Sequence, residues 1–327
     1  MIRSASEVPV RAIIISECPA HCDFCHFEGG PRDGRSLSLA EVSVMAEVAA
    51  SLSVKQIQLT GGEPLLRNDI PHIVYRILDR HPSAKIALTT SGLLLTEGLA
   101  RTLYSCGVNK LNVSLAPWLF EACRIQKPSE VEDGIERLMP LVMVFAENAA
   151  LKFNFTVKRD WLVHLPNVIG TCSRLSVPLD CMTVGWHPGL TEDWYRSAYV
   201  EPSTVIKILF PFVQDIALRF EATPYLELLA EGKTVGRLKD PGISRAFRLR
   251  ECVDCPFSGV CPETSCAVRV YPGWHVGACL LDLKRGEAVE TATETGFRES
   301  MVTTYGAIAK AIDKLTFLQF GKSKQVQ

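Results

Sequence analysis

The sequence predicts an α/β protein built on a partial barrel of six parallel strands, with a small C-terminal domain added. Three observations support this prediction. Short apolar runs alternate with longer segments of helical period from residue 10 to residue 184. The apolar runs are nearly continuous, which is typical of parallel strands that are buried on both faces. After residue 184 the alternation stops, and a segment rich in cysteine, proline and glycine follows.

Six apolar runs of about five to seven residues are expected to form the strands, because each is rich in Ile, Val, Leu or Phe and ends near a turn or a loop. They are residues 10–16, 56–60, 85–90, 110–114, 152–157 and 179–184. Six strand–helix units are enough for a partial or open barrel, and a closed barrel of this kind has eight.

Five segments of helical period separate the strands. They cover residues 39–52, 69–80, 97–106, 131–147 and 161–172. The first follows Ser38 and contains Glu41, a spacing typical of a capping box, which satisfies free amides at the start of a helix. The barrel is assigned to residues 1–200 and the C-terminal domain to residues 201–327.

The C-terminal domain is expected to contain helices at residues 202–220, 225–231 and 299–318. A small hairpin is expected from residues 268–271 and 275–276, since Pro272 and Gly273 lie between the two runs. The polar end of the chain is expected to fray.

Composition and charge exclude several classes of protein. The 327 residues include 35 Lys and Arg against 36 Asp and Glu, a formal net charge of −1. This balance gives no basic excess for binding nucleic acid, so no DNA partner is expected. No run approaches about 18 apolar residues, and the first residues lack a signal-peptide pattern, so no membrane association is expected. The chain is therefore expected in a reducing cytoplasm, where its 12 cysteines would not pair as disulfides.

The first of two cysteine groups follows directly on the first expected strand and consists of Cys18, Cys22 and Cys25. Three thiolates on one short loop can ligate three irons of a cubane cluster and leave the fourth iron open. Soft thiolate sulfur favours an iron–sulfur cluster or zinc over harder metals. Because zinc normally takes four ligands, often from two paired elements, this spacing favours the cluster.

A glycine-rich turn, from Thr60 to Pro64, ends the second expected strand. Gly61 and Gly62 would let the backbone approach a ligand closely, and the carboxylate of Glu63 can accept a hydrogen bond from a cationic amine. The turn lies at the C-terminal end of a barrel strand, which is the face where barrel enzymes place their sites.

A second group of five cysteines lies in the C-terminal segment: Cys252, Cys255, Cys261, Cys266 and Cys279. They could hold one auxiliary iron–sulfur cluster, with four ligands and a spare or with three ligands and an open iron. Four of them could instead hold a structural zinc ion. The other four cysteines are interpreted as small buried apolar residues: Cys106, Cys123, Cys172 and Cys181.

The cysteine triad and the Gly-Gly-Glu turn together resemble those of the radical S-adenosylmethionine (SAM) superfamily. The resemblance implies a TIM-like (β/α)6 barrel and an enzyme whose [4Fe–4S] cluster binds SAM at the open iron. An electron from the cluster would cleave SAM to methionine and a 5′-deoxyadenosyl radical, which abstracts hydrogen from the substrate. A reducing partner such as flavodoxin or ferredoxin is implied as well. The second cysteine group resembles the auxiliary-cluster extensions of the twitch and SPASM types.

Within that superfamily the chain is similar to the GTP cyclases of molybdenum-cofactor biosynthesis. The similar blocks are Arg11 and residues 22–26, 59–67, 89–92, 112–115 and 152–154. The resemblance implies a SAM site lined by Phe24, Gly61, Gly62, Glu63, Pro64, Thr90 and Ser114. It implies substrate contacts from Arg11, Lys152 and Arg269. Arg11 and Lys152 could instead be solvated residues at strand ends.

Departures from the family pattern bear on the substrate. Gln58 stands where the family carries an arginine, Val268 replaces one of two arginines after a cluster cysteine, and Ala116 replaces an aspartate. Losing two guanidinium groups removes the bidentate contacts that triphosphate and guanine recognition need. We therefore expect a paralogue that acts on a small-molecule or nucleotide-like substrate rather than a faithful GTP cyclase. One alternative is a maturase that modifies a ribosomal peptide, and another is a non-catalytic metal or electron-transfer scaffold.

Overall fold

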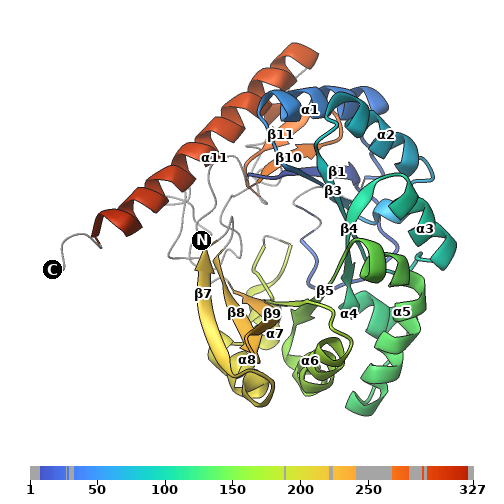
Figure 1. Ribbon diagram of the computed structural model, residues 1–327, viewed down its shortest axis with the longest axis vertical. Coiled ribbons are helices and arrows are strands. Elements are labelled where there is room, and N and C mark those ends of the chain that lie inside the picture. Colours follow the sequence, from blue (N-terminus) through green and yellow to red (C-terminus); the bar gives the residue numbers. More distant parts are fainter. Residues whose placement is uncertain are drawn as a thin grey trace.

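The computed structural model describes residues 8–26, 28, 33–187, 189–220, 224–240, 267–279, 289–290 and 293–322. The described strands form one 12-stranded sheet in the order β12-β11-β10-β1-β2-β3-β4-β5-β6-β9-β8-β7. Figure 1 shows this sheet curving around a central space, with most of the helices on its outer side.

The centre of the sheet contains six strands, each parallel to the next. They are β1 (Val10–Ile15), β2 (Gln56–Gly61), β3 (Lys85–Thr90), β4 (Val108–Ser114), β5 (Ala150–Val157) and β6 (Leu179–Thr183). All six expected strands are present, and their first and last residues differ from the expected ones by two positions or fewer. The parallel α/β core predicted from the alternation is therefore confirmed.

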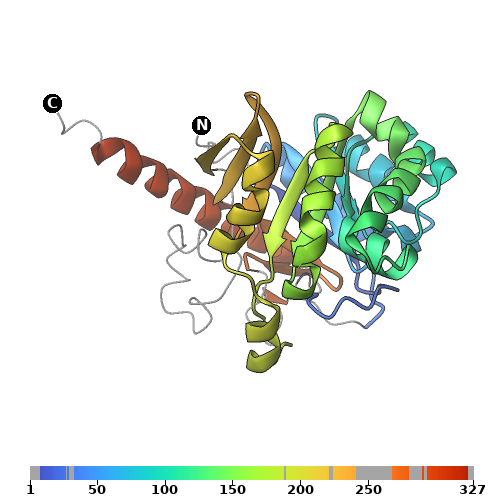
Figure 2. The ribbon, with the colours of Figure 1, turned by 90° about the horizontal axis from the view of Figure 1, so that it is seen from below.

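The helices between these strands pack on the outer face of the sheet (Figure 1 and Figure 2). They are α1 (Leu39–Ser51), α2 (Ile70–Arg80), α3 (Glu97–Ser105), α5 (Val131–Asn148) and α6 (Leu165–Arg174). Ser38 and Glu41 form the expected capping box: the Ser38 hydroxyl accepts from the Glu41 amide at 3.2 Å, and the Ser38 amide donates to the Glu41 carboxylate at 2.8 Å. These two bonds fix the residue at which α1 begins.

Two of the helices expected after residue 200 differ from the prediction. One is shorter than expected, and the other is a strand. The first expected helix ends early as α8 (Pro202–Leu209), and the chain continues through a short 3₁₀ turn into β7 (Asp215–Phe220). Pro211 lacks an amide hydrogen and so ends the helix. The second expected helix is a strand, β8 (Pro224–Ala230), which forms a hairpin with β9 (Lys233–Lys239).

The turn between β8 and β9 explains why the segment before it is a strand. Glu231 and Gly232 both adopt positive φ, at 52° and 71°. Two consecutive residues of positive φ favour the tight turn that joins antiparallel strands. The apolar run before this turn is therefore a strand of the sheet, and β9 pairs in parallel with β6.

The other edge of the sheet is formed by the expected hairpin of β10 (Val268–Tyr271) and β11 (His275–Gly277), which is confirmed. β10 pairs in parallel with β1, and β12 (Val289–Glu290) pairs with β11. The turn of the hairpin is held against α1, because the Glu41 carboxylate accepts from the amides of Gly273 and Trp274 at 2.8 Å each. The division of the chain at residue 200 stays a prediction, and the strands described beyond it extend both edges of the barrel sheet.

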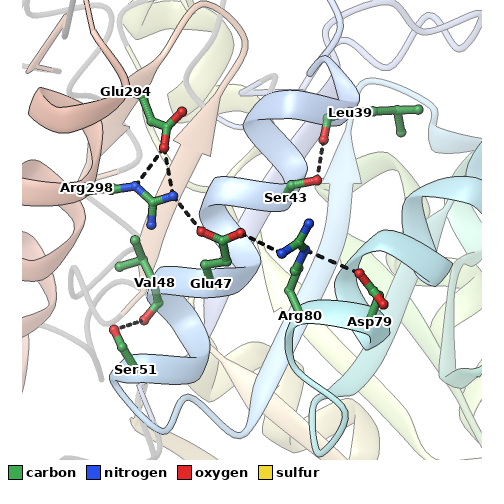
Figure 3. Close-up of polar contacts among 9 residues, drawn as sticks. All are labelled: Leu39, Ser43, Glu47, Val48, Ser51, Asp79, Arg80, Glu294 and Arg298. Atoms are coloured by element: carbon green, nitrogen blue, oxygen red, sulfur yellow. Dashed lines mark hydrogen bonds and ion pairs between the residues drawn. The ribbon is translucent and has the colours of Figure 1, made fainter.

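The last helix, α11 (Glu294–Lys322), begins five residues earlier than expected and projects beyond the barrel (Figure 1 and Figure 2). Its first turns are tied to α1 through Glu47, whose carboxylate lies 2.5 Å from Arg298 and 3.3 Å from Arg80 of α2 (Figure 3). Glu47 thus links three helices. None of the helices in the described ranges has both the length and the apolar character that a membrane span requires.

Candidate functional site

A cavity of about 480 Å³ lies on the inner side of the curved sheet. Its wall includes side chains at every second position of β2, β4 and β5: Gln56, Gln58, Thr60, Lys110, Asn112, Ser114, Lys152, Asn154 and Thr156. Alternate residues of a strand point to the same face, so these polar side chains line the interior, while the residues between them face the helices. The cavity is therefore polar on a wall that the sequence analysis treated as continuously apolar.

The first cysteine group lies at one end of this cavity, in the loop that follows β1. Cys18, Cys22 and Cys25 are half-buried and all line the cavity. The Cys25 amide donates to the Cys22 carbonyl at 3.2 Å, which folds the loop into a turn. Burial raises the pKa of the Cys22 thiol, and Cys25, Glu121 and Cys18 raise it further by their charges. The three sulfur atoms are thus near neighbours.

The three cysteines fit a cubane cluster by their donor chemistry. Among the described residues, no three His, Cys, Asp or Glu side chains are close enough together to hold a single metal ion. The three thiolates of a cubane cluster bind three different irons, so they do not have to converge on one point. Three half-buried thiols on one loop, open to a polar cavity, meet that requirement.

The cysteine loop is held in place by Glu121, which belongs to a short π-helix (Trp118–Ala122) after β4. The two oxygens of its carboxylate accept from the backbone amide of His21 at 3.2 and 3.3 Å, and one of them also lies 3.7 Å from the Cys22 sulfur. A single side chain therefore fixes both the backbone and a thiol of the loop.

A second anchor comes from the segment after β5. Lys158 donates to Asp23 at 2.8 Å, and its ammonium lies 4.7 Å from the centre of the Trp161 ring. Phe24 packs edge-on against the same ring at 5.6 Å, and Phe120 stacks on it at 4.5 Å. The loop residues between Cys22 and Cys25 are thus held by an ion pair and an aromatic cluster.

The Gly-Gly turn at the end of β2 runs directly against the chain that leads into the cysteine loop. The Gly62 amide donates to the Ile15 carbonyl at 2.7 Å, and the Glu63 amide donates to the Glu17 carbonyl at 2.7 Å. A Cβ atom would lie 2.2 Å from the Ile15 oxygen at Gly61, and 2.0 Å from the Glu17 oxygen at Gly62. Both glycines are therefore needed for contact between two backbone segments, and both also line the cavity.

Glu63 has a different environment from the one expected. Its side chain is fully buried, and the carboxylate accepts from the Thr90 hydroxyl and the Ser91 amide at 2.7 Å each, from the Ser91 hydroxyl, and from the Leu65 amide at 3.1 Å. Neither Glu63 nor Pro64 lines the cavity, whereas the other expected SAM contacts do: Phe24, Gly61, Gly62, Thr90 and Ser114. In this structure Glu63 joins the end of β2 to the end of β3.

One wall of the cavity is formed by β10, β1 and β2, where Arg269, Arg11 and Gln58 are neighbours in register. Arg11 donates to the buried carboxylate of Glu28. Arg269 is fully buried and donates to the Ala278 carbonyl at 3.1 Å. Both arginines line the cavity, and both have protein partners.

Gln58, at the position of the arginine in the similar family, donates to the Thr89 hydroxyl at 2.8 Å. The Asn112 side chain donates to the same hydroxyl at 3.2 Å. Three neighbouring strands are therefore joined by uncharged hydrogen bonds at this level of the barrel. The charge that an arginine would bring to this wall is absent from position 58.

The opposite wall carries Lys152 and Lys239, and behind it lies the buried carboxylate of Asp180 on β6, which the sequence analysis missed. It accepts from Lys152 at 2.5 Å and from Lys239 at 2.8 Å, and Arg237 lies 4.0 Å away. Burial and the positive charges of Lys239 and Lys110 lower the pKa of Lys152 to about 7, although Asp180 opposes that shift. Burial alone would raise the pKa of Asp180, but Lys239 and Lys152 outweigh it and hold that pKa well below its usual range.

Most of the second cysteine group lies outside the described residues: Cys252, Cys255, Cys261 and Cys266. Cys279 is described and half-buried after β11. The described residues on either side of segment 241–266 are Asp240 and Ala267, and both line the cavity. The auxiliary cluster stays a prediction.

Residues 12–141 match the family model described as the Radical SAM superfamily. The chain carries a radical SAM domain. The matched residues of this domain run from β1 into α5, so they include the cysteine loop, the Gly-Gly turn and Glu121. The recognition made from the cysteine triad and the Gly-Gly-Glu turn is confirmed.

Curated relatives of the radical SAM domain are named as probable GTP 3′,8-cyclases. The one from Methanocaldococcus jannaschii is 34% identical over 177 residues, which cover 52% of this chain and 56% of the relative. The one from Pyrobaculum aerophilum is 31% identical over 208 residues, which cover 62% of this chain and 65% of the relative. The chain spans less than two thirds of the length of either relative. The match to the Radical SAM superfamily model indicates an enzyme.

Solved radical SAM structures share the fold over most of the chain. Streptococcus suis SuiB bound to precursor peptide SuiA aligns with a TM-score of 0.59 and 11% identity, over 91% of this chain and 64% of that one. Native anSMEcpe with bound AdoMet aligns with a TM-score of 0.58 and 13% identity, over 93% of this chain and 82% of that one. At these identities the likeness is one of fold.

Proposed function

We propose that this protein is a radical SAM enzyme that removes a hydrogen atom from a small-molecule or nucleotide-like substrate bound inside the barrel. The single observation that carries the proposal is the shared cavity. Cys18, Cys22 and Cys25 line it from the loop after β1, and Arg11 and Lys152 line it from β1 and β5. Cluster ligands and substrate contacts would then face the same enclosed space, as hydrogen abstraction requires.

In this proposal the three cysteines hold a [4Fe–4S] cluster, and SAM binds against the Gly-Gly turn. Phe24, Thr90 and Ser114 line the same cavity as this turn. When bound, the cluster and SAM supply a 5′-deoxyadenosyl radical for hydrogen abstraction. The Glu63 carboxylate accepts from Thr90 and Ser91 and so holds the end of β3 in place. An external reductant such as flavodoxin or ferredoxin would deliver the electron.

The wall around Gln58 supports a substrate other than GTP. The Gln58 side chain donates a hydrogen bond to the Thr89 hydroxyl, and the Arg11 guanidinium is paired with Glu28. Neither side chain offers the unpaired guanidinium that a triphosphate binds in bidentate fashion. We therefore propose a relative of the GTP cyclases whose substrate differs, and we expect no cyclised product from GTP. A peptide substrate, as SuiB has in its solved complex, stays a prediction without support from these contacts.

Anaerobic reconstitution tests the proposal. The full chain should take up at least four iron and four sulfide ions, and reduction in the presence of SAM should release 5′-deoxyadenosine. Cys22→Ala should lose both properties. Cys106→Ala is the matched control, because Cys106 is also half-buried but directly follows α3 and does not line the cavity, and it should keep both. Stoichiometric zinc without nucleoside release would support a metal scaffold and refute the enzyme.

A further inference from the structure

A buried cation lies between the cysteine loop and the segment after β5. The residue is Lys158, which is 9% exposed and immediately precedes the short 3₁₀ helix Arg159–His164. Its ammonium lies 2.8 Å from the Asp23 carboxylate and 3.7 Å from that of Asp160. Burying an ammonium group costs free energy unless an opposite charge or the face of an aromatic ring replaces its water. The position of Lys158 therefore depends on Asp23 and on the Trp161 ring, whose centre is 4.7 Å away.

Trp161 is the centre of an aromatic group that joins three parts of the chain. Its ring stacks on Phe120, with the ring centres 4.5 Å apart, and packs edge-on with Phe24 at 5.6 Å. The ring of Phe155, on β5, lies 6.4 Å away. Stacked and edge-on rings attract one another beyond the effect of burial alone. The Trp161 amide donates to the Lys158 carbonyl at 2.9 Å, so one turn of the chain contains both the ring and the cation.

This aromatic group connects two residues to which the proposed function assigns contacts with SAM. Phe24 lies in the cysteine loop and lines the cavity. Ser114 also lines the cavity, at the end of β4, and the chain continues from it through a short α-helix into the π-helix that contains Phe120. Phe24 and Ser114 thus belong to separate elements, and Trp161 packs against a phenylalanine of each.

Lys158 and Trp161 themselves lie behind the cavity wall. Neither side chain lines the cavity, so each can act on a bound ligand only through other residues. Both also lie outside residues 12–141, the part of the chain that matches the superfamily model. A ligand that contacts two elements binds more tightly when those elements are already held in the bound geometry, because less conformational freedom is lost on binding.

We propose that Lys158 and Trp161 are positioning residues for SAM, and we call the two residues the SAM clamp. Through Asp23 and Phe24 they hold the middle of the cysteine loop in a fixed position relative to Ser114, so that the SAM site is formed before SAM binds. The inference rests on the proposed function, because it takes SAM to be the ligand between these elements. It adds that residues outside the cavity determine part of the affinity for SAM.

Binding of SAM to the anaerobically reconstituted full chain tests the SAM clamp. Equilibrium dialysis measures the dissociation constant at equal iron content, and electron paramagnetic resonance of the reduced cluster records the spectral change that SAM causes. Trp161→Leu should weaken SAM binding by about tenfold, the size of effect that the loss of one aromatic contact can produce, and should diminish the spectral change. Trp161→Phe keeps an aromatic ring and should restore most of the loss.

A matched control separates positioning from general stability. Tyr104 also packs edge-on against a phenylalanine, Phe145, at 6.0 Å, and it does not line the cavity. Tyr104→Leu should therefore bind SAM as the wild type does. A residue that only stabilised the fold would lower iron uptake or thermal stability and leave the SAM affinity of the loaded protein unchanged. That result in Trp161→Leu overturns the proposal.

A second variant tests the other half of the SAM clamp. Lys158→Met removes the ion pair with Asp23 and keeps an unbranched apolar side chain, and it should also weaken SAM binding. Because both residues act on one loop, the double variant should lose less affinity than the product of the two single losses. Losses that multiply would refute a shared clamp. If neither single variant takes up iron, the two residues serve the folding of the loop, and the proposal is overturned.

The same preparations separate the two proposals. Clamp variants with weakened SAM binding, in a wild type that binds SAM but releases no 5′-deoxyadenosine, refute the radical enzyme and retain the SAM clamp. Release of 5′-deoxyadenosine by the wild type, with unchanged SAM affinity in both clamp variants, refutes the SAM clamp and retains the enzyme.

Discussion

Both carboxylate oxygens of Glu121 accept from the backbone amide of His21, at 3.2 and 3.3 Å. The same side chain lies 3.7 Å from the Cys22 sulfur. A residue 99 positions away in the chain therefore sets both the shape of the cysteine loop and the charge beside one of its thiols. This relationship leads to the first prediction.

Glu121→Gln should raise the reduction potential of the cluster, by roughly tens of millivolts, because it removes a negative charge that disfavours the added electron. The amide oxygen can still accept from His21, so the loop should keep its shape. A redox titration followed by electron paramagnetic resonance measures the change. Glu97→Gln, on the exposed face of α3, is the control and should leave the potential unchanged. An unchanged potential in Glu121→Gln would mean that the carboxylate acts only on the backbone.

Gly62→Ala should prevent normal folding of the cysteine loop. Its Cβ would lie 2.0 Å from the Glu17 carbonyl oxygen, so one of the two backbone segments must move. We expect a loss of about 2 kcal/mol or more in the free energy of unfolding, together with reduced iron uptake. Thermal denaturation and iron analysis measure the two effects. Gly98→Ala in α3 meets no atom within 4 Å and should be neutral or slightly stabilising, and equal behaviour of the two variants would contradict the prediction.

Binding of sulfate in the cavity beside Lys152 should weaken as the pH rises through 7. The pKa of Lys152 is lowered to about 7 by burial and by the charges of Lys239 and Lys110, so its ammonium is charged below that pH and neutral above it. Asp180 keeps its charge across this range, because Lys239 and Lys152 hold its pKa well below its usual range. Sulfate is the suitable probe for calorimetry, since its own charge does not change there.

The variant Lys152→Met tests whether Lys152 causes this pH dependence. The variant should bind sulfate weakly and with an affinity that is nearly constant between about pH 6 and pH 8. A wild-type affinity that is equally flat over that interval would show that Lys152 stays charged.

Arg67→Met should destabilise the junction between β1 and α1. The Arg67 guanidinium donates to the Ile14 carbonyl at 2.9 Å and to the Leu37 carbonyl at 2.5 Å, and it pairs with Asp69. Removing it leaves two carbonyl groups without this donor, for which we expect a loss of about 2 kcal/mol in unfolding free energy. Denaturant unfolding measures the effect. Arg76→Met, at an exposed position of α2, should change stability little, and a similar loss there would point to a general effect of charge.

The parallel core and the cysteine loop could be predicted from the sequence because their signals are local. Helical period, short apolar runs and the spacing of Cys18, Cys22 and Cys25 all lie within a few residues. The hairpin around Gly273 was predicted for the same reason. The strand at 224–230 was not, because a short apolar run has no period that distinguishes a strand from a buried helix.

The charged wall depends on contacts between distant residues, which no local pattern contains. Asp180 and Lys239 are 59 positions apart and meet only because β9 pairs with β6. The alternation of Lys152 with Asn154 along β5 was a signal for an inward polar face, and it was present in the sequence. The role of Glu63 depends on Ser91 of the next strand, so it also required the structure.

The position of β10 has a consequence for biosynthesis. β1 lies between β2 and β10, so after its synthesis β1 waits for one of its neighbours until residues 268–271 have been translated. Until then one edge of β1 has no partner in the sheet, and an unpaired strand edge promotes association with other chains. A nascent chain halted shortly before residue 268 would therefore need protection by a chaperone, whereas one released after that point could close the sheet on its own.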